Sequence, residues 1–147
     1  MATSTSKPID ILLVEDSPSD AALAIEALKA GKTASTLNHI EDGIEAMNYL
    51  RQRDKYMKAI RPDLIMLDLD LPGMDGREVL AEIKADDDLK IIPIIVLTTS
   101  SSDQDILKSY QLGANCFITK PVDFANFVNM VKSIKDFWLT VVTLPVK

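Results

Sequence analysis

The chain alternates between short apolar runs and stretches with helical spacing, and this alternation limits its folds more than any other feature. The apolar runs begin at Ile11, Leu37, Leu64, Ile91 and Cys116. Each is followed by a segment whose apolar residues recur at helical spacing. Parallel strands need crossover connections, and helical crossovers cover the two faces of the sheet. The sequence therefore predicts a doubly wound α/β fold around a parallel, five-stranded sheet.

Local signals set the expected limits of several helices. Ser17 can cap a first helix whose first turn tolerates Pro18. The second helix is expected to start near Ile44 and to run into the charged stretch 51–58, before Pro62 ends the connection. Two later helices are expected near 103–111 and 123–138.

The length of 147 residues suits one domain with one buried core. We expect residues 9–138 to form that domain, with a disordered arm at 1–8 and an apolar extension at 139–147. No glycine-rich nucleotide-binding fingerprint can be assembled from the five glycines.

Charge and hydropathy exclude several classes of function. Lys and Arg number 16 against 22 Asp and Glu, so the net charge is −6 and disfavours direct binding to nucleic acid or anionic lipid. The apolar run from Ile91 to Leu97 is far shorter than the roughly 20 residues that cross a bilayer. With no secretory signal at the start and a single cysteine, Cys116, we expect a cytoplasmic protein with no membrane segment.

Polar residues stand where the predicted strands end. Glu15-Asp16 follow the first strand, Asp68 the third, Thr98 closes the fourth, and Lys120 follows the fifth. In open α/β sheets, ligands bind outside the carboxyl ends of the strands. A buried carboxylate such as Asp68 is costly unless it is paired or bound to metal. We therefore predict one functional site at this edge, although each residue alone has an ordinary structural explanation.

The sequence resembles the receiver domains of two-component response regulators over roughly Ile9 to Phe137. The resemblance rests on Glu15-Asp16, on Asp68-Leu-Asp-Leu-Pro-Gly-Met-Asp-Gly76, on Thr98-Thr99 and on Lys120-Pro121, in the family's order. It implies a flavodoxin-like strand order 2-1-3-4-5. It also implies a single-domain response regulator that signals through protein contacts and is not an enzyme beyond assisting its own phosphorylation and dephosphorylation.

The resemblance also implies a role for each matching residue. Asp68 is the expected phosphoacceptor, and it is also expected to hold a metal ion together with Glu15, Asp16 and the backbone carbonyl of Asp70. Thr98 is the expected switch hydroxyl.

The remaining roles belong to residues near the last two strands. Lys120, on an outer strand, is expected to reach the phosphoryl group and to pair with Asp68 at rest. Phe117 is the expected switch aromatic, and a plain core role for it stays open. Asp70 and Ser100, beside the path of an attacking water, are expected to tune the lifetime of the phosphoryl group.

The acids themselves favour a divalent cation. Clustered carboxylates repel one another and take up protons unless a cation neutralises them. Mg²⁺ binds through one or two carboxylates, several waters and a substrate phosphate, whereas Ca²⁺ needs six to eight oxygen ligands. We therefore expect Mg²⁺ at the site.

The partner must supply the donor histidine, because His39 is the only histidine in the chain. The apolar tail resembles that of small stand-alone response regulators that partner cyanobacterial phytochrome histidine kinases, some of which dimerise. We expect a histidine kinase as partner, and the narrower resemblance implies a phytochrome. The tail, with Phe137, Trp138 and Leu139, packs either on its own last helix or on a second copy as a homodimer. The sequence indicates no particular downstream target.

Two other functions remain open at this point. Asp68-Leu69-Asp70 also matches the D-x-D motif of a haloacid-dehalogenase-like phosphatase, although that motif normally lies at the first strand. A degenerate binding module that is never phosphorylated is the third reading, and the intact acids, Thr98 and Lys120 weigh against it.

Overall fold

The computed structural model describes residues 9–29, 35–98, 113 and 116–119 of the chain. Within these ranges the strands are β1 (Ile9–Val14), β2 (Ser35–Ile40), β3 (Leu64–Leu67), β4 (Ile94–Thr98) and β5 (Cys116–Thr119). Each neighbouring pair is parallel, and the order across the sheet is β2-β1-β3-β4-β5. The predicted order 2-1-3-4 is confirmed, and the backbone of β5 lies beside β4. β3 is therefore the central strand.

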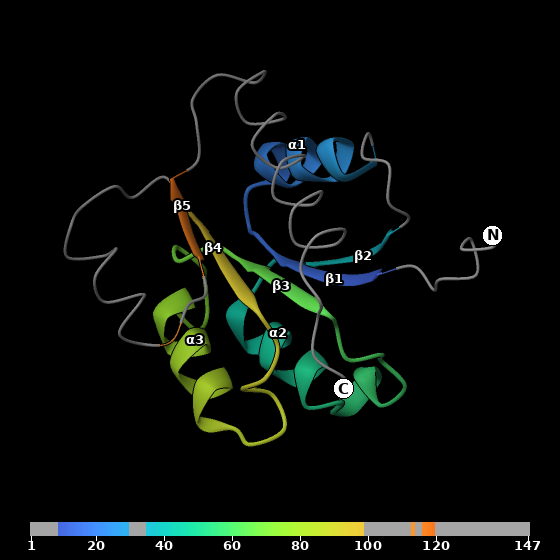
Figure 1. Cartoon of the computed structure of the whole chain (residues 1–147), viewed down its shortest axis with the longest axis vertical. Coiled ribbons are helices and arrows are strands. Elements are labelled where there is room, and N and C mark those ends of the chain that lie inside the picture. Colours follow the sequence, from blue (N-terminus) through green and yellow to red (C-terminus); the bar gives the residue numbers. More distant parts are fainter. Residues whose placement is uncertain (1–8, 30–34, 99–112, 114–115, 120–147) are drawn as a thin grey trace, which may run out of the picture.

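Helices cover both faces of this sheet. α1 (Pro18–Lys29) lies on one face, and α2 (Gly43–Leu50) and α3 (Gly76–Ala85) lie on the other (Figure 1). This arrangement confirms the predicted doubly wound architecture for the described helices. The helices expected at 103–111 and 123–138 fall outside the described residues. Among the helices that the structure describes, none has the length and apolar character needed to cross a bilayer.

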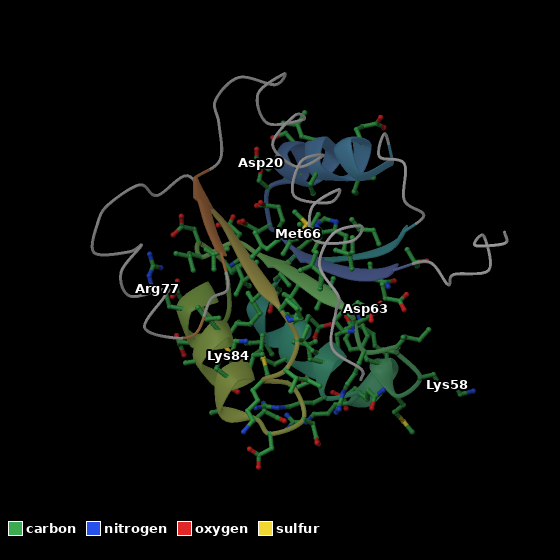
Figure 2. The ribbon with its side chains drawn as sticks, viewed as in Figure 1. Asp20, Lys58, Asp63, Met66, Arg77 and Lys84 are labelled. Carbon is green, nitrogen blue, oxygen red and sulfur yellow. The ribbon has the colours of Figure 1, made fainter. Side chains whose placement is uncertain are left out.

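Two apolar layers follow from the alternation of side chains along the strands. One layer packs under α2 and α3, and its strand residues are Leu12, Val14, Ile40, Ile65, Leu67, Ile94 and Val96. The intervening residues point to the opposite face, which α1 covers with its buried Ala21 and Ala24. Met66 lies between the sheet and α1 (Figure 2). All four residues of β3 are buried, as expected for a central strand covered on both faces.

Short polar side chains start each α-helix that the structure describes. The Asp20 amide donates to Ser17 Oγ at 3.3 Å, so Ser17 caps α1 as predicted. Asp42 Oδ1 accepts from the amides of Ile44 and Glu45 at 2.7 and 3.1 Å. Asp75 Oδ2 accepts from the Arg77 amide at 3.0 Å. These caps fix where each crossover leaves the carboxyl edge of the sheet.

The second helix is shorter than the sequence predicts. α2 ends at Leu50, and only a 3₁₀ turn, η2 (Asp54–Tyr56), follows within the stretch that was expected to continue the helix. Gln52 and Asp54 have positive φ angles of 56° and 53°, which an α-helix cannot accommodate. Neither residue is glycine, so the pattern of residue types gave no sign of this break.

Candidate functional site

The register of the sheet brings the acids of two strands to one point. Val14 and Leu67 are paired across β1 and β3, so Glu15 and Asp68 each come one residue beyond this pair. The Asp68 amide donates to the Val14 carbonyl at 3.0 Å and continues the ladder to the acid itself. Carboxylate oxygens of Glu15, Asp16 and Asp68 all lie within 4.8 Å of one another. The structure confirms that these three acids form one cluster.

Two of the three carboxyl groups are buried. Glu15 is 2% exposed and Asp68 is 6% exposed, whereas Asp16 is exposed. Backbone amides two residues further along orient both buried side chains. The Ser17 amide donates to Glu15 Oε2 at 3.2 Å, and the Asp70 amide donates to Asp68 Oδ1 at 3.1 Å. The carboxylates of Glu15 and Asp68 are thus each oriented by a backbone amide of the same loop, and Asp16 lies on the solvent side.

These side chains offer the ligand atoms that a hard divalent cation needs. All of the ligand atoms are carboxylate oxygens, which Mg²⁺, Mn²⁺ and Ca²⁺ prefer. Two ionised carboxylates about 5 Å apart repel by roughly 3 kcal/mol at the effective dielectric constant typical of protein sites. A cation between them turns that repulsion into attraction. The cluster is therefore suited to hold a divalent metal ion with one side open to solvent.

A close approach of α3 supports the loop that carries Asp68. Leu69 is fully buried, and its carbonyl accepts from the Gly76 amide at 2.9 Å. A Cβ atom on Gly76 would lie 2.5 Å from Leu69 Cα and would also press on the Asp68 carbonyl. Only glycine fits there without a shift of the loop. In the sequence Gly76 is the last residue of the family motif, and its close contact with Leu69 was not predicted.

The other predicted site residues are placed only in part. Thr98 is the last residue of β4, the strand next to β3, so its backbone lies at the same edge of the sheet as Asp68. Phe117 lies in β5, paired with Val96. The side chains of Thr98 and Phe117 lie outside the described part, as do Ser100 and Lys120. Asp70 is exposed and follows the buried Leu69.

The proposed tail interface, Phe137, Trp138 and Leu139, also falls outside the residues that the structure describes. The pairing of Lys120 with Asp68 therefore stays a prediction, as do the switch and lifetime roles.

One neighbour of the acids was missed by reasoning from sequence. His39, on β2, places its Nε2 atom 2.7 Å from the backbone carbonyl of Glu15. In the sequence it served only to exclude a site with several histidines. Its position next to the end of a strand adjoining β1 was the available signal.

A second polar group, around Glu45 in the first turn of α2, behaves differently from the acid cluster. The Tyr56 hydroxyl donates to Glu45 Oε1 at 2.9 Å, and Lys55 Nζ lies 3.3 Å from the same oxygen. The hydrogen bond from Tyr56, followed by that from Lys55, lowers the pKa of the Glu45 carboxyl. Glu45 is thus bonded to a hydroxyl and an ammonium group and not to other acids, as in a structural ion pair.

Comparison with known proteins agrees with this geometry. Residues 11–132 match the family model of the response regulator receiver domain. Response regulator Rcp1 of Synechocystis sp. is 48% identical over 145 residues, with 99% of each chain covered. The crystal structure of the phosphorylated cyanobacterial phytochrome response regulator RcpA has a TM-score of 0.92 and 49% identity, and covers 95% of this chain and 100% of that one. The Mn²⁺-bound form of Rcp1 has a TM-score of 0.91 at 49% identity, with the same coverage.

The chain belongs to the response regulator receiver family. It is similar to cyanobacterial phytochrome response regulators over nearly its whole length. This membership decides against the dehalogenase-like phosphatase: the acid pair follows β1, and Asp68 follows β3. The metal in the Rcp1 crystal is Mn²⁺, a hard cation of the kind that the acid cluster suits.

Proposed function

We propose that this chain is a single-domain response regulator that accepts a phosphoryl group on Asp68 from a histidine kinase and signals by Mg²⁺-dependent switching. The cluster of Glu15, Asp16 and Asp68 at the carboxyl edge of the sheet carries this proposal. Asp68 is the member that the fold buries at the end of the central strand. That position places its carboxylate next to Glu15 and to the exposed Asp16.

The reaction assigned to Asp68 is a phosphoryl transfer. One carboxylate oxygen forms a bond to phosphorus while the bond from phosphorus to the donor imidazole nitrogen breaks, and that nitrogen keeps the electron pair. The product is an acyl phosphate. Glu15, Asp16, Asp68 and the Asp70 carbonyl would hold Mg²⁺, which neutralises charge on the phosphoryl oxygens when bound. The amide of Asp70 donates to Asp68 Oδ1 and so orients the carboxylate.

The order of the sheet supports the roles proposed for Thr98 and Lys120. Neighbouring strands lie about 5 Å apart, so a short hydroxyl at the end of β4 suffices to meet a group on Asp68. β5 is two strands from β3, about 10 Å away, and a long side chain such as Lys120 is needed from there.

Phosphorylation gives Thr98 a new acceptor that one conformation satisfies best, so the populations shift. In this scheme Phe117 fills the space that Thr98 leaves. Because both residues sit on the last two strands, the output surface would lie on that side of the molecule.

The proposed partner is a phytochrome histidine kinase in the cytoplasm. The similarity to RcpA, a cyanobacterial phytochrome response regulator, supports this choice.

We also propose that Phe137, Trp138 and Leu139 contribute to a homodimer. Sedimentation of a chain ending at Asp136 tests the dimer, and an unchanged dimer would eliminate the tail as the interface.

The phosphoacceptor is tested by intact mass. The full chain is incubated with phosphoramidate or acetyl phosphate and Mg²⁺, with Asp68→Asn and an EDTA-treated sample in parallel. We expect an adduct of about 80 Da in the wild type with Mg²⁺ and none in the other two samples. A wild type that gains no adduct from either donor would favour the degenerate binding module instead.

Decay of the adduct in Asp70→Ala and Ser100→Ala tests the lifetime role, and rates equal to the wild type would refute it.

A further inference from the structure

The edge strand β2 holds both backbone polar groups of Glu15, the first acid of the site. The Glu15 amide donates to the Ile40 carbonyl at 2.9 Å. At the carbonyl of the same residue, His39 Nε2 lies 2.7 Å from the Glu15 oxygen. A carbonyl oxygen accepts and cannot donate, so Nε2 must carry the hydrogen of this bond. Both hydrogen bonds come from neighbouring residues of β2.

The bond from His39 acts on the peptide that joins the two acids. The Glu15 carbonyl and the Asp16 amide belong to one planar unit, so fixing the carbonyl fixes the direction in which the chain enters Asp16. The Glu15 carboxylate is held separately by the Ser17 amide. Asp16 is exposed, and the packing that fixes a buried side chain is weaker there. The placement of its carboxylate therefore depends strongly on the backbone that His39 fixes.

We infer that His39 is a positioning residue for metal binding: its imidazole N–H holds the Glu15–Asp16 peptide so that both acids face Asp68. The inference rests on the proposed function, since it assigns His39 to the same metal site. Outer groups that orient metal ligands typically change metal affinity by about 10- to 100-fold when they are removed. His39 bonds to the backbone of a ligand residue and not to its carboxylate, so its effect should lie near the lower limit.

The surroundings of His39 permit a clean substitution. The residue is half-buried and lines an open pocket with Asp42, Glu45 and Tyr56, so changes of shape there need not disturb the core. His39→Leu removes the donor and keeps a similar volume. His39→Gln carries an amide N–H at about the place of Nε2. Asn38→Leu is the matched control, because Asn38 lies on the same strand and points to the opposite face of the sheet.

The experiment measures Mn²⁺ affinity of the full chain by the electron paramagnetic resonance signal of free Mn²⁺. We expect His39→Leu to bind Mn²⁺ about 10-fold more weakly than the wild type. His39→Gln should restore affinity to within about 3-fold, and Asn38→Leu should match the wild type. The Mg²⁺ concentration that gives half-maximal phosphorylation by phosphoramidate should rise in the same order, and saturating Mg²⁺ should restore the rate of His39→Leu.

Several results would overturn the inference. Equal Mn²⁺ affinity in His39→Leu and wild type would do so, as would a His39→Gln variant as weak as His39→Leu. An equal loss in Asn38→Leu would show a general effect of the strand. The proposed function can fail separately. A wild type that binds Mn²⁺ but takes no phosphoryl group would refute the phosphoacceptor role of Asp68, and the Mn²⁺ affinities would still decide the role of His39. A wild type that binds no Mn²⁺ would refute both proposals.

Discussion

The body of β3 and the residue that follows it differ sharply in what they bury. Leu64 to Leu67 are all apolar and all buried, and they pack against helices on both faces of the sheet. Asp68 comes next and is nearly as buried, at 6% exposure, yet it carries a carboxyl group. One step along the strand therefore separates residues that stabilise the fold from a residue whose burial has a cost.

The body of β3 and the carboxyl edge of the sheet therefore have different roles. The strand body fixes the fold, and by pairing Val14 with Leu67 it delivers Glu15 and Asp68 to the same edge. The edge gathers like charges, which weakens the fold but creates affinity for a cation. Changes in the body should therefore appear as losses of stability, and changes at the edge as losses of metal and phosphoryl binding.

The largest effect is expected from adding a carboxylate one residue before Asp68. Leu67→Asp places a charge in the layer under α2 and α3 and should lower the free energy of unfolding by more than about 4 kcal/mol. Leu67→Ala should lower it by about 2–5 kcal/mol. Urea unfolding followed by circular dichroism measures both. Ile60→Asp is the control, since Ile60 is 62% exposed, and the same loss in that variant would contradict the contrast.

Metal binding should stabilise the protein through the edge alone. Mg²⁺ at about 100 times its dissociation constant should raise the free energy of unfolding by about 2.7 kcal/mol, and EDTA should remove the gain. Asp16→Asn and Asp68→Asn should lose most of this increment, because each removes a ligand charge. Glu45→Gln, at the separate ion pair on α2, should keep it. Thermal melts with and without Mg²⁺ measure the increment, and a full increment in Asp68→Asn would count against the site.

A smaller effect is expected where α3 touches the loop of Asp68. Gly76→Ala adds a Cβ against Leu69 Cα and should cost about 1–2 kcal/mol, despite the better helix propensity of alanine. The shift of the loop should also slow phosphorylation of Asp68. Glu78→Ala, in the same helix turn and exposed, serves as control and should stay within about 0.5 kcal/mol. A Gly76→Ala protein as stable and as fast as that control would show that the close contact has no role.

The smallest effect concerns Glu45, the carboxylate of the separate ion pair on α2. Tyr56→Phe should raise the pKa of Glu45 toward its ordinary value of 4.5, because the hydrogen bond from Tyr56 is the main cause of the lowered pKa. A pKa lowered in the folded state gives stability that is present above the unfolded value and is lost as pH falls through the folded value. The effect on stability is therefore confined to acid pH. An NMR titration of Glu45 in both proteins checks it, and equal pKa values would refute it.

Much of the fold followed from patterns that need no tertiary information. Apolar runs, the capping residue Ser17 and the turn residues predict strands and crossovers, and parallel pairing then places Glu15 and Asp68 at one edge. The end of α2 could not be predicted, because Gln52 and Asp54 adopt positive φ angles that their residue types do not demand. The contact of His39 with Glu15 depends on the pairing of β2 with β1, which no local pattern specifies.

The identity of the phosphorylated residue tests the central claim most directly. The full chain is phosphorylated with phosphoramidate and Mg²⁺, reduced with borohydride, which converts an aspartyl phosphate to homoserine, and mapped by peptide mass spectrometry. We expect homoserine at Asp68 and at no other aspartate, and only when Mg²⁺ is present. Homoserine at Asp70 or Asp16, or an unmodified Asp68 in a sample that carries the adduct, would contradict the assignment of Asp68.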